Sequence, residues 1–151
     1  MPPKILDKHT LKTWLLADPA TDAVRPSSFA IIDVRDDDYI GGHIKTSRHH
    51  PSSSFAVGLP YLHAELQEIS VLVFHCALSQ QRGPAAANMY LRYKNMIGAD
   101  KAPVSGYVAE SSTEQMVYVL RGGFTEWQRE FGQDERLTEA YDEGYWKYSN
   151  Q

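Results

Sequence analysis

Apolar residues along this chain follow two patterns, one typical of strands and one typical of helices. Short apolar runs rich in branched residues, at residues 29–34, 71–75 and 116–120, predict buried strands. Apolar residues three or four positions apart predict helices within residues 8–16 and 59–69. Because strands alternate with helices, the pattern indicates an α/β fold with a central, mainly parallel sheet and helices on both of its faces.

Capping residues, prolines and glycines add further boundaries. Asp7 stands where the N-cap of the first helix is expected. Pro84 favours the first turn of a helix that continues to Ile97. A pair of glycines at residues 122–123 predicts a turn before a short helix at residues 125–131.

The stretches between these elements are expected to be loops. Residues 17–28 contain prolines and small polar residues, and residues 98–114 are poor in large apolar groups, which predicts an exposed, mobile connection. Residues 35–38 form an acidic segment whose three aspartates, at residues 36–38, could supply an acid from a neighbouring loop, but we interpret the segment as a solvated turn. The tail, residues 132–151, is acidic and aromatic, and the sequence leaves open whether it packs loosely or firmly on the domain.

Composition limits the class of protein. The 151 residues, 42% of them hydrophobic and 23% charged, are typical of one soluble globular domain spanning residues 1–151. A formal net charge of −4 without a basic stripe argues against nucleic-acid binding, and no apolar stretch reaches the length needed to cross a bilayer. A single cysteine excludes an internal disulfide and a four-thiolate metal site. Together these features predict a protein of the cytoplasm or of the nucleus.

The segment from His75 to Pro84 carries the chemistry that the sequence predicts. It joins a buried strand to a helix, which is where ligands bind in open α/β sheets. Backbone N–H groups of such a loop can converge on an anion and stabilise a thiolate. Cys76 is therefore predicted to be the nucleophile, and the planar fork of Arg82 to hold two oxygens of a tetrahedral oxyanion. The Ser79 hydroxyl is expected either to hydrogen-bond the thiolate or to assist the departing cysteine. The residues expected to wrap around the oxyanion are Ala77, Leu78, Ser79, Gln80 and Gln81.

Each conspicuous residue also has a plainer interpretation. A lone cysteine is usually buried and inert, but the preceding strand, the spaced Arg82 and the Gly-Pro pair favour catalysis for Cys76. His75 precedes Cys76 on a strand, so its side chain should point to the opposite side, as a hydrogen-bonded core histidine. His49 and His50 are adjacent and lack further ligands, so no metal site is expected.

Three separated segments resemble the rhodanese-like fold, and specifically its M-phase inducer phosphatase branch. They are IDVR with YIGGHIK at residues 32–35 and 39–45, HC with RGP at residues 75–76 and 82–84, and VLRGGF at residues 119–124. The chain is similar to the small, single-domain fungal and plant members, of which some are phosphatases and some are arsenate reductases. The resemblance implies a three-layer α/β/α fold, with Cys76 as nucleophile, Arg82 as oxyanion clamp and the loop amides as a cradle. It also implies that Asp33 and Arg35 form a structural pair beside the loop.

The resemblance leaves two activities open. One is a phosphatase for phosphomonoesters, of the phosphotyrosine or dual-specificity type, which forms a cysteinyl-phosphate and needs no cofactor. The other is an arsenate reductase with glutathione and glutaredoxin as co-substrates. M-phase inducer phosphatases carry acidic residues inside this loop, where this chain has Ala77 and Gln81, and a glutamine cannot donate a proton as a carboxylic acid can. The uncharged loop thus resembles that of the arsenate-reducing members and leaves the general acid unassigned.

Two other interpretations are disfavoured. Sulfurtransferases of the rhodanese type have a shorter active loop, whereas this loop has the longer form associated with phosphate or arsenate. Rhodanese-like binding modules commonly lose the nucleophile, whereas Cys76 and Arg82 are both present here. The expected partners are therefore a phosphorylated substrate or arsenate, with glutaredoxin in the second case, and neither nucleic acid nor a membrane.

Overall fold

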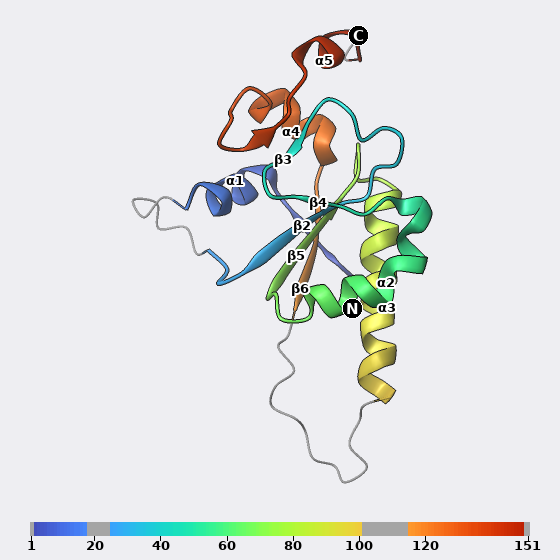
Figure 1. The fold of residues 1–151 in the computed structure, drawn as a ribbon. Helices are drawn as coiled ribbons and strands as arrows, with labels where there is room; N and C mark the ends of the chain where they lie inside the picture. Colours follow the sequence, from blue (N-terminus) through green and yellow to red (C-terminus); the bar gives the residue numbers. More distant parts are fainter. Residues whose placement is uncertain (1, 18–24, 101–114, 150–151) are drawn as a thin grey trace.

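A parallel sheet forms the centre of the computed structural model, which describes residues 2–17, 25–100 and 115–149 (Figure 1). Five strands lie in the spatial order β1-β6-β5-β2-β4, and every neighbouring pair is parallel. The strands are β1 (Lys4–Leu6), β2 (Phe29–Asp33), β4 (Arg48–His49), β5 (Val71–His75) and β6 (Met116–Leu120). Their carboxyl ends all lie at one edge of the sheet, at the top of Figure 1.

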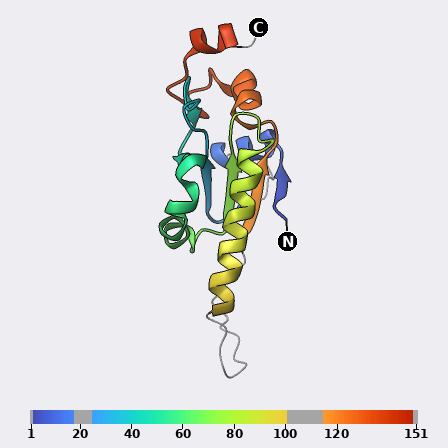
Figure 2. The same ribbon diagram turned by 90° about the vertical axis from the view of Figure 1, so that its right-hand side faces the viewer.

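Four helices cover the two faces of the sheet. On one face lie α2 (Phe55–Leu66) and α3 (Arg82–Asp100), and on the other lie α1 (Lys8–Leu16) and α4 (Gly123–Phe131). Figure 2 turns the face that carries α2 and α3 toward the viewer and shows α1 behind the sheet. The three-layer α/β/α architecture predicted from the sequence is confirmed.

Two hydrophobic cores explain why the central strand is apolar along its length. Side chains alternate between the faces of a strand. Leu72 and Phe74 of β5 therefore pack under α2 and α3, while Val71 and Val73 pack under α1 and α4. Cys76, directly after β5, continues the first of these two rows.

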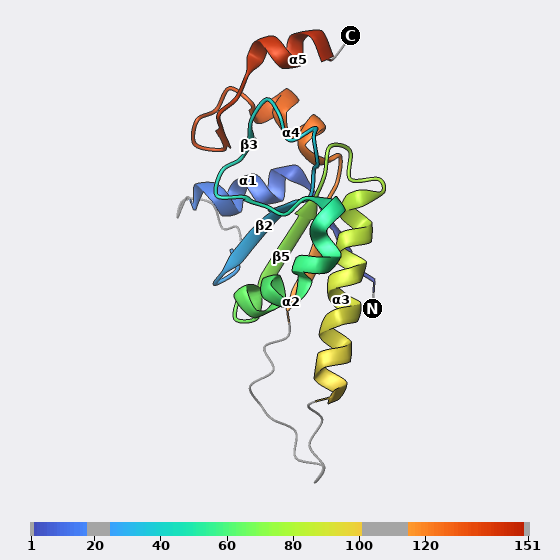
Figure 3. The same cartoon turned by 45° about the vertical axis from the view of Figure 1, so that its right-hand side comes forward.

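The last part of the chain packs against this body. Its short elements are β7 (Thr138–Glu139) and α5 (Glu143–Ser149). Two other short elements precede α2, namely the strand β3 (His43–Ile44) and the 3₁₀ turn η1 (Ser52–Ser54). β7 pairs antiparallel with β3, and α5 lies at the end of the molecule where the sheet strands end (Figure 3). Trp146 is 8% exposed and donates its indole N–H to Gly41 O at 2.9 Å. The tail is thus fastened to the Gly41–Gly42 turn rather than loose over its described residues.

Three elements expected from the sequence have the predicted bounds. They are the helix at residues 8–16 and the strands at residues 71–75 and 116–120. Asp7 is the N-cap of the helix, and its carboxylate accepts the N–H of His9 at 2.8 Å. In all three, a strong local pattern agrees with the position in the sheet or on its face.

Two predicted helix boundaries are wrong. α2 ends at Leu66 and does not continue to Ile69, whose N–H closes a turn onto Leu66 O at 2.9 Å. Ile69 is apolar because it still packs on the core beyond the helix end. α4 begins at Gly123 rather than at Thr125, so half of the predicted glycine turn belongs to the helix.

Parts of the predicted loops lie outside the described residues, namely residues 18–24 and 101–114. The expected mobile connection at residues 98–114 is therefore described only at its start. There α3 continues to Asp100, so the beginning of that stretch is helical. Among the described residues, no helix is both long and apolar enough to span a membrane.

Candidate active site

Helix α4 holds the loop between β5 and α3 in place through backbone hydrogen bonds. Cys76 follows the last residue of β5, and Arg82 is the first residue of α3. The N–H groups of Phe124 and Thr125 donate to the carbonyl oxygens of Cys76 (3.0 Å) and Ala77 (2.9 Å). These bonds fix the start of the loop and turn its carbonyl groups toward α4.

Gly123 makes this close approach possible. Its φ is +57°, which L side chains rarely adopt, and a Cβ there would stand 2.4 Å from Cys76 O. A larger residue would push α4 away from the loop and break both hydrogen bonds. The glycine therefore serves the candidate site, and not only the chain reversal that the sequence predicted.

The sulfur of Cys76 is almost fully buried, since the residue is only 3% exposed. Two backbone N–H groups donate to it, from Ser79 at 3.2 Å and from Gly83 at 3.4 Å. Ser79 has a left-handed backbone with a φ of 57°, which turns its N–H back toward the sulfur. Two donors aimed at one sulfur are suited to a negatively charged thiolate.

The Ser79 hydroxyl is not where the sequence placed it. Its Oγ accepts the N–H of Cys76 at 3.4 Å instead of donating to the sulfur. The expectation considered only side-chain chemistry, whereas the left-handed backbone gives the contact with sulfur to the amide. The hydroxyl therefore joins Ser79 to the backbone at the start of the loop.

A small cavity of about 270 Å³ opens beside the sulfur. The residues lining it all come from the loop and the first residue of α3: Cys76, Ala77, Leu78, Gln80, Gln81 and Arg82. Among the described residues, the backbone N–H groups of Leu78, Gln80 and Gln81 have no acceptor. Unpaired N–H groups in front of a helix N-terminus can bind an anion, so the loop has donors available for the predicted oxyanion.

The guanidinium of Arg82 is bound by two carboxylates. Its Nη2 lies 2.5 Å from Asp38 Oδ2, and its Nη1 lies 2.8 Å from Asp38 Oδ1 and 3.2 Å from Asp36 Oδ2. These side chains stay partly exposed, with 32% for Arg82 and 37% for Asp38. The interpretation of residues 35–38 as a solvated turn is wrong for these two aspartates, because their oxygens bind the guanidinium of the arginine that is predicted to clamp the anion.

Hydrogen bonds keep both carboxylates ionised. Hydrogen bonds from Arg82 are the main cause of the lowered pKa of Asp38. For Asp36 the main cause is the Ser52 hydroxyl, which together with Ser53 and Arg82 lowers the pKa to about 2. The pKa of Arg82 is raised, chiefly by Asp38. Near neutral pH, neither aspartate holds a proton that it could give to a leaving group.

A second ion pair, between Asp33 and Arg35, is completely buried beside the loop. Arg35 Nη2 donates to Asp33 Oδ2 at 2.7 Å, and Arg35 Nε lies 3.0 and 3.1 Å from the two carboxylate oxygens. Both residues are 0% exposed. Burial of Asp33 acts to raise its pKa, and the hydrogen bonds and positive charge of Arg35 act to lower it. The pair that the resemblance implied is thus formed.

Arg35 connects three parts of the site. Its Nη2 also donates to Gly42 O at 2.9 Å, which holds the end of the loop that carries Asp36 and Asp38. Its guanidinium lies over the ring of Phe124, 4.3 Å from the ring centre, and so contacts α4. The buried pair therefore positions the two partly exposed aspartates and the helix that contacts the loop after β5.

His75 is a buried, neutral member of this cluster. Its Nδ1 lies 3.2 Å from Cys76 O, and because a carbonyl oxygen can only accept, the proton is on Nδ1. Its Nε2 lies 3.7 Å from Asp33 Oδ2 and has no hydrogen-bond partner among the described residues. Burial lowers the pKa of His75, and Asp33 offsets this only in part. The ring contacts the Cys76 backbone and Asp33, so it supports the loop and does not reach the cradle.

Among the described residues, no three His, Cys, Asp or Glu side chains lie close enough to hold a metal ion. His49 is engaged elsewhere, with Nε2 2.6 Å from Arg35 O and its ring stacked on Tyr39 at 3.7 Å. His43 lies 3.6 Å from a carboxylate oxygen of Glu139. The histidines near the loop therefore have structural partners.

Sequence reasoning considered Asp36 and Asp38 only as possible acids from a neighbouring loop and preferred a solvated turn, so it missed their pairing with Arg82. One signal for them was available, because an acidic run directly after β2 must lie near the end of its neighbour β5. The carboxyl ends of adjacent parallel strands meet at the same edge of a sheet. Which carboxylates reach Arg82, however, depends on the loop that Arg35 shapes.

Fold and site together define a class of protein. Residues 12–130 match the family described as the rhodanese-like domain, and the chain belongs to this family. The resemblance seen in the sequence is therefore confirmed.

Relatives of the chain include both kinds of enzyme. The chain is 36% identical over 154 residues to the CDC25-like phosphatase YCH1 of Saccharomyces cerevisiae, covering 95% of this chain and 94% of the relative. It is 40% identical over 106 residues to arsenate reductase 2.2 of Oryza sativa subsp. japonica, covering 70% and 73%. The solved structure of Ygr203w, described as a yeast protein tyrosine phosphatase of the rhodanese family, matches with a TM-score of 0.76 at 33% identity, over 97% of this chain and 98% of that one.

Proposed function

We propose that this protein is a cysteine-dependent phosphatase that hydrolyses phosphomonoesters through a cysteinyl-phosphate. The observation that carries the proposal is the buried Cys76 sulfur, which receives two backbone N–H groups beside a cavity lined by loop residues and Arg82. Relatives that align over most of the chain, in Saccharomyces cerevisiae and in Schizosaccharomyces pombe, are named phosphatases.

The proposed reaction has two displacements at phosphorus. In the first, the Cys76 thiolate attacks phosphorus, the bond to the substrate oxygen breaks, and the substrate oxygen leaves as an alkoxide or phenolate that takes a proton from water. In the second, water attacks the phosphorus, the S–P bond breaks, and inorganic phosphate leaves with the thiolate restored. Arg82 and the unpaired loop amides stabilise negative charge on the phosphoryl oxygens in both steps. The proposal requires no cofactor and no metal.

Arg82 has to exchange partners to act in this way. Its terminal nitrogens are bound by Asp36 and Asp38, and these are the nitrogens that two phosphoryl oxygens need. A partly exposed ion pair is worth about 1 kcal/mol or less, so a bound phosphoryl dianion can displace it. The carboxylates then hold the arginine ready between turnovers.

The proposed enzyme should prefer aryl to alkyl phosphates. Gln81 cannot protonate a leaving group, and Asp36 and Asp38 are ionised in the structure. A phenolate leaves without that help more easily than an alkoxide does. Phosphotyrosine is therefore the favoured class of substrate, and phosphoserine the disfavoured one.

Arsenate reduction is the second candidate, and the uncharged loop with the 40% identity to a rice arsenate reductase supports it. In that reaction the Cys76 thiolate would attack arsenic, and an oxygen of arsenate would leave as water. Glutathione and glutaredoxin would then act as co-substrates whose thiols supply the two electrons that convert arsenate to arsenite.

One preparation assayed side by side distinguishes these activities. We expect hydrolysis of p-nitrophenyl phosphate to exceed glutathione-dependent arsenate reduction and thiosulfate-to-cyanide sulfur transfer, and Cys76→Ser to abolish it while circular dichroism stays unchanged. Inhibition by phosphate without any phosphatase turnover would favour the reductase. Full activity of Cys76→Ser would refute both cysteine mechanisms.

We also propose that the protein acts in a reducing compartment, the cytoplasm or the nucleus. Cys76 is the only cysteine of the chain, so its recovery from oxidation depends on external thiols such as glutathione. Imaging of the tagged full-length chain tests this proposal, and a location in an oxidising compartment would contradict it.

A further inference from the structure

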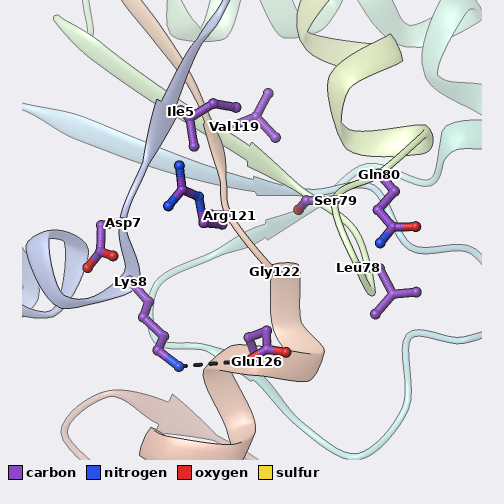
Figure 4. Close-up of a pocket in the computed structure, with 10 residues that line it drawn as sticks. All are labelled: Ile5, Asp7, Lys8, Leu78, Ser79, Gln80, Val119, Arg121, Gly122 and Glu126. Carbon is purple, nitrogen blue, oxygen red and sulfur yellow. Dashed lines mark ion pairs between the residues drawn. The ribbon is translucent and has the colours of Figure 1, made fainter.

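A second cleft, of about 490 Å³, adjoins the cradle. It lies between β1, the start of α1, the end of β6 and the loop after β5, as Figure 4 shows. Leu78 and Gln80 line both this cleft and the cradle, so a group bound in the cleft would be a direct neighbour of a phosphoryl group on Cys76. The cleft is therefore placed to hold the part of a substrate next to the phosphate.

Three cations line the two cavities, and only one of them lacks a carboxylate partner among the described residues. Lys8 lies 3.1 Å from Glu130 and 3.9 Å from Glu126. Arg82 is held by its two aspartates. No described carboxylate oxygen lies within 4.0 Å of the Arg121 guanidinium. Arg121 can thus bind an incoming anion without breaking an existing ion pair.

Arg121 differs from an ordinary surface arginine in how firmly its backbone is held. It directly follows β6, and its N–H donates to Leu6 O at 2.9 Å. Three residues later, Phe124 donates to Cys76 O. The Cα of Arg121 is therefore tied both to the edge strand and, through the start of α4, to the loop after β5, and its side chain lines the cleft on the side of β1 (Figure 4).

Apart from Gln80, the other side chains that line the cleft are apolar or already engaged. Leu78 and Ile5 are large apolar residues that are 49% and 56% exposed on this side of the molecule. The carboxylate of Asp7 caps α1, and that of Glu126 pairs with Lys8 and Arg129. A side chain with an apolar stem and a negative end fits such a surface, because the stem can cover the apolar residues while the charge meets Arg121.

We propose that this cleft binds the residue next to the phosphorylated residue of a peptide substrate, and that Arg121 selects an acidic side chain there. The inference rests on the proposed phosphatase function. It assigns the substrate class as phosphotyrosine peptides with a neighbouring Glu or Asp. Arg121 is thereby a specificity residue, separate from the displacement at phosphorus.

The test compares two phosphotyrosine peptides that differ only by Glu or Gln beside the phosphotyrosine, prepared with the substitution on either side. The readout is the ratio of kcat/KM for the Glu peptide to that for the Gln peptide, so a general loss of activity cannot imitate the effect. We expect the native protein to prefer the Glu peptide by about threefold to tenfold, mainly through KM, as for a partly exposed ion pair. Arg121→Gln should bring the ratio to one, and Arg121→Glu should invert it in favour of a Lys peptide.

A matched control is Arg136→Gln, because Arg136 is an exposed arginine outside both cavities. It should keep the native ratio. Hydrolysis of p-nitrophenyl phosphate together with a native ratio of one, or a preference that survives in Arg121→Gln, would overturn the inference and leave the phosphatase proposal intact. If the native protein hydrolyses neither the aryl phosphate nor any peptide, the phosphatase proposal fails and the inference falls with it.

Discussion

Two arginine–aspartate pairs stand side by side in this molecule, and they differ mainly in their exposure. Arg35 and Asp33 are completely buried, whereas Arg82 and Asp38 keep about a third of their side-chain surface exposed. The buried arginine also binds backbone carbonyls and lies on an aromatic ring, so each of its contacts fixes another part of the fold. The exposed arginine is bound at its two terminal nitrogens by carboxylates alone.

The difference teaches what each pair can do. Separating a buried pair leaves charge in a medium that cannot solvate it, so such a pair stays closed and acts as a scaffold. A partly exposed pair loses little when water or a ligand replaces one partner, so it can exchange. The same two residue types thus build a fixed support and a movable clamp at the same edge of the sheet, where β2 and β5 end.

The largest expected effect is on stability, from Arg35→Met. Removing this guanidinium leaves the Asp33 carboxylate buried without its partner, which should cost about 3–5 kcal/mol in the free energy of unfolding, measured by urea denaturation. Adding Asp33→Asn should recover part of this loss. Arg136→Met, at an exposed arginine, is the control and should change little. A loss below about 1 kcal/mol in Arg35→Met would contradict the scaffold role.

The next effect is on activity, from Arg82→Gln. We expect kcat/KM for p-nitrophenyl phosphate to fall about 10²- to 10³-fold, as when a donor to a transition-state oxyanion is removed. The free energy of unfolding should change by about 1 kcal/mol or less, because the pair is partly exposed. If this variant instead loses as much stability as Arg35→Met, the contrast between the two pairs is wrong.

The two regions should also lose stability in different ranges of pH. Burial lowers the pKa of His75 below 6.5, so the unfolded chain takes up a proton first and stability falls as pH drops below 6.5, by up to about 1.4 kcal/mol per pH unit. The pKa of Asp36 is lowered from 3.8 to about 2, so its contribution to stability is lost as the pH falls from 3.8 to about 2. The free energy of unfolding, measured by denaturation at a series of pH values, should depend less on pH just below pH 6.5 in His75→Asn. In Asp36→Asn it should depend less on pH between pH 3.8 and about 2. We call these two ranges the upper and the lower range.

His50 is the control for the upper range, because burial lowers its pKa as well. His50→Asn should remove only its own share and leave the contribution of the fully buried His75. A pH dependence in the upper range that is unchanged in His75→Asn would show that this histidine is not the group responsible.

The smallest expected effect concerns Asp38→Asn. Losing one negative partner makes Arg82 more available, so inhibition by inorganic phosphate should strengthen by about threefold to fivefold. Asp37→Asn is the matched control, since no hydrogen bond or ion pair of the Asp37 side chain occurs among the described residues. Weaker phosphate inhibition in Asp38→Asn would mean that this carboxylate orients Arg82 toward the anion instead of competing with it.

Much of the site follows from local pattern. The strand at residues 71–75 and the start of the next helix place residues 76–82 at the end of a parallel strand, which predicts an anion-binding loop. The Ser79 hydroxyl, Asp36 and Asp38 were misjudged because a left-handed backbone and a neighbouring loop decide their partners. Neither effect leaves a periodic signal in the sequence.

The sequence by itself determined the alternation of strands and helices, the burial of β5 and the spacing of Cys76 and Arg82, because these depend on side-chain periodicity and on neighbours along the chain. Only the tertiary structure decided which carboxylates bind Arg82, 44 and 46 residues away, and which helix holds the loop. It also placed β1 at the edge of the sheet, where this strand forms one wall of the cleft that Arg121 lines. Contacts of this kind depend on how separate elements pack, and a three-residue strand or an acidic turn carries too little local information to fix them.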